Sequence, residues 1–256
     1  PPCGYGKHMN PCMDCHALMF RLAGQVMEEQ GFDFLFSGEV LGQRPMSQTR
    51  PSLRYVEKHS GYDGYLIRPL SAQRLDESIP EKKGLVDREK LLGFAGRGRK
   101  DQIHLAKHYG ISDYPAPAGG CLLTDKGYSN RLRDLFEHQE DTPERDLDML
   151  KHGRHFRLDE HTKIVVGRTK ADNDMIQRCS DPGEDTTLKT LGYPGPVVVV
   201  PNGGAEGMVL MAAAICAGYT KAPIDQPVEV KVTSPTRENI VEVLPVKPGS
   251  VSNLLI

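Results

Sequence analysis

Apolar and polar residues in the first part of the chain alternate between helical and strand-like patterns. Residues 13–30 carry apolar residues at steps of three and four, which is the period of an amphipathic helix, and Gly31 can end it. The members of this stripe are Leu18, Leu22, Val26 and Met27. Residues 32–36, FDFLF, and 64–71, GYLIRPLS, are short apolar runs followed by polar turns. They predict buried strands of an α/β sheet, with a binding loop at 37–48 after the first strand.

The stretch from 87 to 153 predicts four more helices. They cover residues 87–95, 99–111, 129–138 and 142–152. The last has Thr142 as an N-cap, Pro143 at its first helical position and Gly153 at its end. Between the second and third helices, YPAPAGGCLLTD at 114–125 is rich in proline and glycine. It predicts a rigid loop whose backbone can approach a ligand closely.

The pattern changes after Gly153. The expected elements are a hairpin at 155–168, a central strand at 195–204, a buried helix at 208–217, and a pair of strands at 228–233 and 239–246. Because helices dominate before this point and strands after it, we expect a boundary within 145–153. The two domains would then be 1–148 and 149–256.

The composition is that of a soluble globular protein. Of the 256 residues, 38% are hydrophobic and 26% are charged, and the longest apolar run is too short to span a membrane. The 32 basic and 34 acidic residues leave a net charge of -2, which excludes nucleic-acid binding by overall charge but permits a local basic face. Six cysteines are too few for a disulfide framework, and no signal segment is present, so we expect a cytoplasmic protein.

Two cysteines stand at the start of the first predicted helix. Cys12 and Cys15 follow Asn10-Pro11, and backbone amides at a helix start favour the thiolate form. Cys121, in the predicted rigid loop, offers a third thiol. Three thiolates suit a soft metal or an iron–sulfur cluster, whereas one thiol that carries sulfur and a second that releases it would form a metal-free relay. The simpler interpretation is two small buried residues at a helix start.

Two polar loops carry clustered arginines. The first, residues 42–54, follows a predicted strand, and the second, GRGRK at 96–100, precedes a predicted helix. Guanidinium groups suit phosphate, so both loops are candidates for contact with a nucleotide or RNA. The alternative for each is a solvated surface loop.

Several segments occur in an order that resembles a known enzyme family. NPCMDC, the helix after it, FDFLFSGEVLGQRPMSQ, RPLSA, GRGRK and DYPAPAGGCLLTD together resemble the ATP-dependent tRNA thiouridylases of the PP-loop ATP pyrophosphatase superfamily, over residues 4–140. The resemblance implies a partial doubly wound parallel-sheet core of the adenine nucleotide hydrolase kind, followed by a smaller α/β domain. It also implies an enzyme that adenylates a tRNA uridine with ATP and Mg²⁺ and then transfers sulfur to it, which makes thiouridine.

The resemblance assigns roles to individual residues. Cys12, Cys15 and Cys121 match the family's cysteine motifs and would be catalytic, and members with this arrangement are similar to those that hold a [4Fe-4S] cluster. The ATP and uridine pocket would be formed by Ser37, Gly38, Glu39, Arg44 and Gln48. Glu39 departs from the 2-thiouridylases, which have Thr-Gly-His where this chain has Ser-Gly-Glu.

The second half carries a different resemblance. TKIVVGRTKADNDMI and MAAAICAGYTKAP resemble the RNA-binding domain of NFACT proteins, with Gly167, Arg168 and Asn173 as the matching residues. The basic residues that would contact phosphate are Arg154, Arg157, Lys163, Arg168 and Lys170. The alternative is an ordinary α/β domain with a Gly-Arg turn.

One motif of the thiouridylases has no counterpart in the sequence. Their pyrophosphate loop, Ser-Gly-Gly-x-Asp-Ser, cradles phosphate with backbone amides, and no segment matches it. We therefore expect an N-terminally truncated member that does not hydrolyse ATP by itself. The expected partners are tRNA and a sulfur donor, a homodimer is allowed, and no membrane is involved. The alternative function is a non-catalytic RNA-binding module whose cysteines hold a structural metal.

Overall fold

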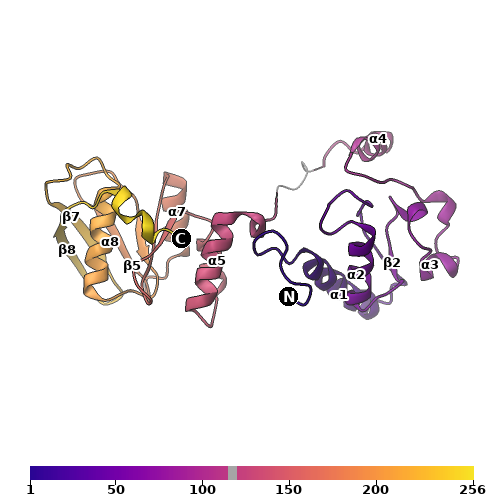
Figure 1. The fold of residues 1–256 in the computed structure, drawn as a ribbon, viewed down its shortest axis with the longest axis horizontal. Helices are drawn as coiled ribbons and strands as arrows, with labels where there is room; N and C mark the ends of the chain where they lie inside the picture. Colours follow the sequence, from indigo (N-terminus) through magenta and orange to yellow (C-terminus); the bar gives the residue numbers. More distant parts are fainter. Residues whose placement is uncertain (115–119) are drawn as a thin grey trace. The chain divides into compact units, whose positions relative to one another are not determined.

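The computed structural model describes residues 1–114 and 120–256, which form two compact units, Pro1–Thr124 and Asp125–Ile256 (Figure 1). Residues 115–119 of the predicted rigid loop lie outside the described residues. The division falls before the boundary expected at 148/149. The reason is that the segment just before residue 149 packs with the second unit: Asp134 pairs with Arg157, and Met149 lies in a cluster with Val165.

The first unit has short strands and several helices. They are α1 (Cys12–Gln30), β1 (Leu35–Phe36), α2 (Arg50–Ser60), β2 (Leu66–Ile67), α3 (Ile79–Lys82) and α4 (Lys100–His108), with 3₁₀ turns η1 (Ala72–Arg74), η2 (Arg88–Lys90) and η3 (Leu122–Thr124). β1 and β2 run parallel and are connected through α2, as in an α/β sheet. The wider parallel core implied by the resemblance is not among the described residues and remains a prediction.

Helix α1 forms where the sequence predicts it, but a different face is buried. Gly31 ends the helix in the left-handed conformation, with φ of 70°. Of the predicted apolar stripe, Met27 is buried, whereas Leu18, Leu22 and Val26 are 51%, 53% and 52% exposed. The buried residues of α1 are Ala17, Gly24 and Met27, and α1 packs against α2. At Gly24 an added Cβ would lie 2.0 Å from Cε2 of Tyr62, which follows α2, so small residues form part of the packed face.

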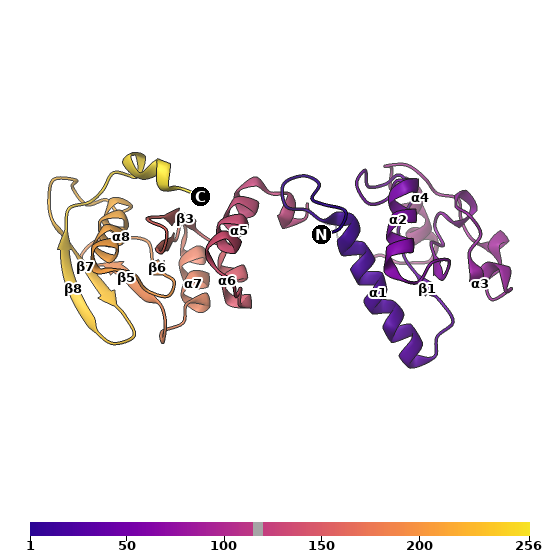
Figure 2. The ribbon, with the colours of Figure 1, turned by 60° about the horizontal axis from the view of Figure 1, so that its bottom comes forward.

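The second unit is built on one six-stranded sheet. Its elements are α5 (Lys126–His138), α6 (Glu144–Met149), β3 (Arg154–Arg157), β4 (Lys163–Val166), α7 (Lys170–Cys179), β5 (Thr186–Thr190), β6 (Val198–Val200), α8 (Glu206–Gly218), β7 (Val228–Thr233), β8 (Glu238–Val243) and the 3₁₀ segment η4 (Pro248–Leu254). The strands run antiparallel in the order β3-β4-β6-β5-β7-β8 (Figure 2). The predicted hairpin and the predicted last strand pair are confirmed.

Both faces of β6 are covered, which explains its sequence. Val198 and Val200 belong to the core beneath α8, whereas Val197 and Val199 pack with Ile176 of α7 on the other face. A strand that is buried on both faces reads as a continuous apolar run rather than as an alternating one. The predicted central strand is therefore confirmed by its position between β4 and β5.

The outer side of β3 is covered by residues 255–256. Leu255 forms an antiparallel bridge with Phe156, and the backbone N–H of Ile256 donates to the carbonyl of His155 at 3.0 Å. These two residues therefore occupy the edge of the sheet at β3.

Three helix predictions change in detail. Within residues 87–95 only the 3₁₀ turn η2 forms. Helix α5 begins three residues early, at Lys126, because the Asp125 side chain caps it by accepting from the Tyr128 N–H at 2.7 Å. Helix α6 has Pro143 as its N-cap residue instead of Thr142, and its first turn has no side-chain cap.

Candidate functional site

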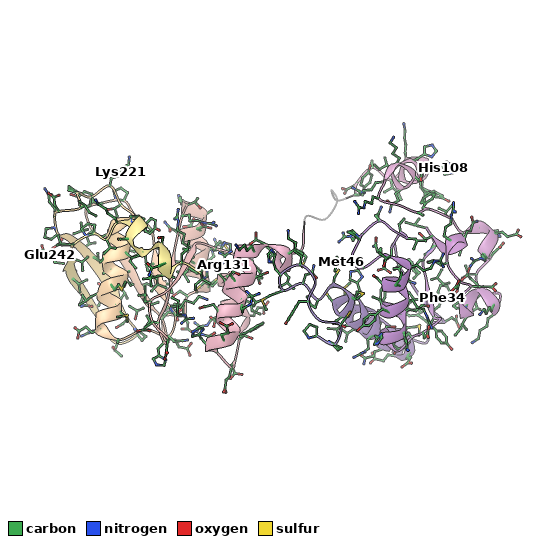
Figure 3. The ribbon with its side chains drawn as sticks, viewed as in Figure 1. Phe34, Met46, His108, Arg131, Lys221 and Glu242 are labelled. Atoms are coloured by element: carbon green, nitrogen blue, oxygen red, sulfur yellow. The ribbon has the colours of Figure 1, made fainter. Side chains whose placement is uncertain are left out.

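Three cysteines line a single cavity of the first unit. Cys12 is the first residue of α1, Cys15 lies almost one turn further, and Cys121 directly precedes η3. The cavity has a volume of about 710 Å³. The basic residues of its wall are Arg44, Arg97 and Arg99. Met46, labelled in Figure 3, belongs to the same wall. The cysteine cavity, as we call it, thus brings together the thiols that the sequence singled out.

Two contacts place the arginine-bearing loops around this cavity. Leu41 forms a parallel bridge with Ala95, which lies just before the GRGRK loop. Gln43 Nε2 donates to Gln102 Oε1 of α4 at 2.6 Å. These contacts hold the two predicted polar loops side by side, so arginines from both reach one site.

The cysteine cavity does not favour a thiolate at Cys15. Burial raises the pKa of the Cys15 thiol above its ordinary value, and the nearby thiols of Cys12 and Cys121 raise it further, because like charges repel. The expectation that the helix start favours the thiolate is therefore wrong in direction for Cys15. Cys12 and Cys121 therefore both disfavour the charged form of Cys15.

The thiols are not arranged as a metal site. Within residues 1–114 and 120–256, no group of three or more His, Cys, Asp and Glu side chains is positioned to hold an ion. Three thiolates have the donor chemistry that soft metals and iron–sulfur clusters require, but these three are not in a ligating arrangement. Iron–sulfur binding by Cys12, Cys15 and Cys121 therefore remains a prediction.

Glu39 contacts His16, one of the residues that line the cysteine cavity. It is 7% exposed, and its carboxylate lies 3.0 Å from His16 Nδ1 and accepts from Arg68 Nε at 2.9 Å. Ser37 Oγ donates to the same carboxylate at 3.2 Å. Burial alone would raise the pKa of Glu39, but hydrogen bonds from His16 and Arg68 and their charges lower it below its ordinary value. Because His16 lines the cavity, Glu39 positions the imidazole of this histidine in the cavity wall.

The remaining residues predicted for an ATP and uridine pocket fall into two groups. Arg44 lines the cysteine cavity, whereas Ser37, Gly38 and Gln48 lie outside its wall as the described residues define it. Gln48 is buried, and its backbone N–H donates to the Arg44 carbonyl at 3.0 Å. Gln48 therefore shapes the loop that carries Arg44.

Gly167, Arg168 and Asn173 lie together around the start of α7. Asn173 Oδ1 accepts from the Val197 N–H at 3.0 Å, and the Gly167 N–H donates to the Val197 carbonyl at 3.0 Å. A Cβ at Gly167 would lie only 1.8 Å from Asn173 Oδ1, so the position requires glycine. Arg168 is exposed and its Nε donates to Asp172 at 2.8 Å. Gly167 and Asn173 therefore stabilise the fold, and Arg168 faces solvent.

Arg157 and Lys163 do not form the exposed basic face that the sequence suggested. Arg157 donates twice to Asp134 of α5, at 2.9 and 2.8 Å, and Lys163 Nζ lies 3.1 Å from the same carboxylate. Lys163 is buried, and burial lowers its pKa although Asp134 opposes the shift. The sequence analysis missed Asp134 because no local pattern connects it to a strand 23 residues further on.

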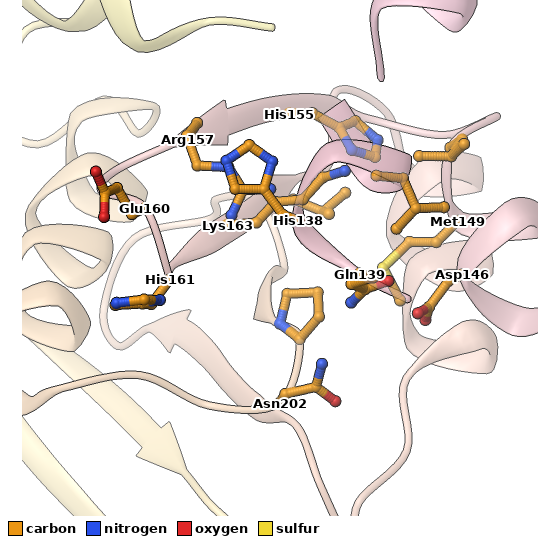
Figure 4. Close-up of a pocket in the computed structure, with 14 residues that line it drawn as sticks. His138, Gln139, Asp146, Met149, His155, Arg157, Glu160, His161, Lys163 and Asn202 are labelled. Atoms are coloured by element: carbon orange, nitrogen blue, oxygen red, sulfur yellow. The ribbon is translucent and has the colours of Figure 1, made fainter. Parts of the chain in front are cut away.

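These paired residues line a second cavity, which we call the α5–α6 cavity (Figure 4). It has a volume of about 160 Å³ and lies among the C-terminal end of α5, helix α6, and strands β3 and β4. Its other polar lining residues are His138, Gln139, Asp146, Glu160, His155, His161 and Asn202. None of these was singled out from the sequence.

A small positive region lies beside α7. Burial lowers the pKa of Arg131, labelled in Figure 3, and the charge of Arg168 lowers it further, which indicates that the two guanidinium groups are near each other. Lys170 is also exposed at the start of α7. Arg168 and Lys170 are thus the members of the predicted basic face that the structure leaves exposed, whereas Arg131 was not predicted.

The second unit has a counterpart among known protein families. Its hairpin, its central strand and the Gly167–Asn173 contact fall within one matched segment. Residues 153–254 match the NFACT protein RNA binding domain. This match supports RNA as a partner of the second unit and agrees with the resemblance seen in the same residues. Residues 1–152 lie outside it, so sulfur transfer by the first unit remains a prediction.

One solved structure is similar to the chain at low sequence identity. The C-terminal of the fibronectin/fibrinogen-binding protein from Streptococcus suis is similar to this chain at 15% identity, covers 95% of this chain and 94% of that chain, and has a TM-score of 0.36. The chain matches no curated protein sequence. Within the described residues, no helix combines the length and apolar character needed to cross a membrane.

Proposed function

We propose that this protein binds RNA and transfers sulfur to a tRNA uridine. The second unit would hold the RNA, and Cys12, Cys15 and Cys121 of the first unit would carry the sulfur. The convergence of these thiols with three arginines on the cysteine cavity is the observation that carries the proposal. Sulfur transfer to RNA needs thiols beside a place where a phosphate-bearing substrate is held, and arginine suits that task.

A persulfide relay fits the free thiols. A sulfur donor first leaves a persulfide on Cys15 or Cys121. A neighbouring thiolate then attacks the inner sulfur of that persulfide, so that the persulfide S–S bond breaks, a disulfide forms between the two cysteines, and hydrosulfide leaves. Hydrosulfide attacks the activated uridine carbon, from which AMP departs. A cellular dithiol reduces the disulfide and restores both thiols.

Activation of the uridine is the step that precedes sulfur transfer in the proposed reaction. Adenylation with ATP and Mg²⁺ is the step expected from the thiouridylase resemblance, with Arg44 as a phosphate contact. The sequence has no Ser-Gly-Gly-x-Asp-Ser segment to cradle the phosphates. The informative measurements on this chain are therefore those that do not require ATP.

Two alternatives use the same cysteines. A [4Fe-4S] cluster on Cys12, Cys15 and Cys121 would supply an open coordination site for sulfur. If the cysteines instead hold a structural metal, the protein would be a non-catalytic RNA-binding module. We favour the metal-free relay because all three thiols are free and line one cavity, and reconstitution with iron and sulfide distinguishes it from the two alternatives. A reducing cytoplasm is the location that suits the free thiols.

RNA binding is tested with the whole chain, labelled tRNA and a series of salt concentrations. We expect affinity to fall as salt rises, because phosphate contacts release counterions. Arg168→Ala should weaken binding and reduce the salt slope by about 1. The matched control is Arg237→Ala, in the turn between β7 and β8, which should change neither quantity. Absence of tRNA binding at every salt concentration would contradict the RNA half of the proposal.

Sulfur loading is tested by incubating the reduced protein with a persulfide donor and locating the added sulfur by mass spectrometry. We expect one extra sulfur on Cys15 or Cys121 and hydrosulfide release that Cys15→Ser or Cys121→Ser abolishes. Cys179→Ser, in the second unit, should behave like the unmodified protein. Anaerobic reconstitution with iron and sulfide is the companion experiment. Stable iron binding without persulfide would replace the relay with a cluster. If neither persulfide nor bound iron is found, the sulfur-transfer half of the proposal is contradicted.

A further inference from the structure

The α5–α6 cavity contains buried polar atoms that lack a partner in the protein. Within the described residues, His155 Nδ1 and Gln139 Oε1 are buried without a hydrogen bond. His155 Nε2 lies 2.9 Å from the His152 carbonyl and donates to it, so the free lone pair is on Nδ1. Lys163 Nζ is ion-paired with Asp134 and keeps further N–H donors. Because buried polar atoms are nearly always paired, His155 Nδ1 and Gln139 Oε1 require partners that the described residues do not supply.

The cavity is larger than a single water molecule requires. Its volume of about 160 Å³ is roughly ten times the ~10–15 Å³ that one water needs. Five of the lining residues are apolar, namely Leu135, Met149, Leu150, Val165 and Pro201, and the other nine are polar or charged. A wall that combines apolar side chains with convergent polar groups suits a small organic ring that carries polar atoms along one edge.

The charges around the α5–α6 cavity favour a neutral ligand over a phosphate. Arg157 and Lys163 are offset by Asp134, which both of them contact, and the Asp146 carboxyl lines the same space. A phosphate would need positive charge in excess of these carboxylates. A neutral ring that offers both hydrogen-bond donors and an acceptor matches the lining better.

We propose that the α5–α6 cavity binds one nucleobase of an RNA strand, with guanine as the preferred base. The inference rests on RNA binding by the second unit. A base turned out of its strand presents a flat ring with polar atoms along one edge, which is how proteins read single-stranded RNA. The pairing edge of guanine has two neighbouring N–H groups for His155 Nδ1 and Gln139 Oε1, and a carbonyl oxygen for Lys163.

The other bases match this set of atoms less well. Uracil has one N–H between two carbonyls, adenine has no carbonyl, and cytosine has no ring N–H on that edge. Each would leave His155 Nδ1 or Gln139 Oε1 without a donor, or Lys163 without an acceptor. An unpaired polar atom in a buried site is costly, so base preference follows from the lining.

The test compares two labelled RNA 12-mers with the whole chain by fluorescence anisotropy. One is oligouridylate and the other is the same strand with a single central guanine. We expect the guanine strand to bind about tenfold more tightly. Replacing the guanine with inosine, which lacks the exocyclic amino group, should remove most of this gain.

Two variants test whether the tighter binding of the guanine strand depends on the α5–α6 cavity. Gln139→Leu removes one acceptor and should abolish the preference for guanine while leaving oligouridylate binding unchanged. Its matched control is Gln177→Leu on the exposed side of α7, which should keep the preference. His155→Phe removes the second acceptor and keeps a planar ring, and its thermal unfolding curve shows whether the fold is intact. Loss of the preference in both cavity variants supports the assignment.

The outcomes separate this inference from the proposed function. Equal binding of the two strands, with RNA binding intact, overturns the nucleobase site alone. Failure of both strands to bind overturns RNA binding and the inference with it. A parallel titration with guanosine monophosphate identifies the source of the base, because affinity equal to that of the guanine strand would make the site one for a free nucleotide and overturn the RNA assignment.

Discussion

Glu39 and Asp134 have the same physical role in the two units. Each is a buried carboxylate that accepts hydrogen bonds from basic side chains, and each has a pKa below its ordinary value because those partners outweigh burial. Glu39 holds His16 at the cysteine cavity, and Asp134 holds Lys163 at the α5–α6 cavity. Single buried carboxylates therefore position the side chains on which both sites depend.

Glu39→Gln should lower the free energy of unfolding of the first unit by about 3 kcal/mol, because it removes a charge partner of the buried Arg68. The pKa of Glu39 is lower in the folded state than the ~4.3 of an exposed glutamate, so its contribution is complete above that pH and is lost as the pH falls through the folded value. Urea unfolding should show a large difference between the two proteins at pH 7 and a smaller one at about pH 3. A difference independent of pH would contradict the role assigned to this charge.

Gly167→Ala should lower the free energy of unfolding of the second unit by about 1–3 kcal/mol, because the new Cβ would displace Asn173 Oδ1 from its bond to Val197. The matched substitution is Gly207→Ala in α8, where a Cβ meets no atom within 4 Å. That change should raise stability by about 0.5–1 kcal/mol, since alanine favours a helix. Thermal unfolding of the two variants measures both effects, and equal stabilities would contradict the packing seen at Gly167.

At the scale of whole elements, the sequence predicted those helices and strands whose formation depends on the local pattern of apolar and polar residues. Helix α1, the β3–β4 hairpin and the β7–β8 pair all have periodic sequences with clear ends, and they form as expected. The buried face of α1 was not predictable, because it is set by where α2 packs. The pairing of Arg157 and Lys163 with Asp134 was missed for the same reason, since tertiary structure brings α5 to the hairpin.

The orientation of α1 gives a direct test at this scale. Leu22→Lys should change the free energy of unfolding by less than about 0.5 kcal/mol, because the leucine is 53% exposed. Met27→Ala should cost about 2–5 kcal/mol, because the methionine is only 6% exposed. Chemical denaturation measures the two costs. A large loss at Leu22 would show that another surface covers the stripe in solution.

The two units differ in how their cores are built. The second unit has an apolar cluster on each face of its six-stranded sheet. Among the described residues, the first unit has a parallel pair of two-residue strands, and four large apolar side chains of α1, Leu18, Met19, Leu22 and Val26, are exposed. The convergence of the cysteines was predictable from the order of motifs. The α5–α6 cavity had no sequence signal, because its lining comes from helices α5 and α6, strands β3 and β4, and the turns after β3 and β6.

Amide hydrogen exchange should reveal this difference across the molecule. We expect the amides of β6 to exchange most slowly, because their opening requires disruption of the core on both faces of the sheet. The amides of Leu35 and Ser37 in and after β1 should exchange much faster, although both are hydrogen-bonded to the β2 segment. Exchange at β1 as slow as at β6 would contradict the contrast between the two units.

The cover that residues 255–256 place on β3 has a consequence for association. An uncovered strand edge is a template on which another chain can add a strand, and it promotes aggregation. The β3 edge is occupied, and the opposite edge strand, β8, carries Glu238 and Glu242. Addition of a further strand is therefore obstructed beside Phe156 of β3. A peptide that recognises proteins by strand addition would find β8 more accessible, because Glu238 is paired with Lys231 and Ile240 is 58% exposed.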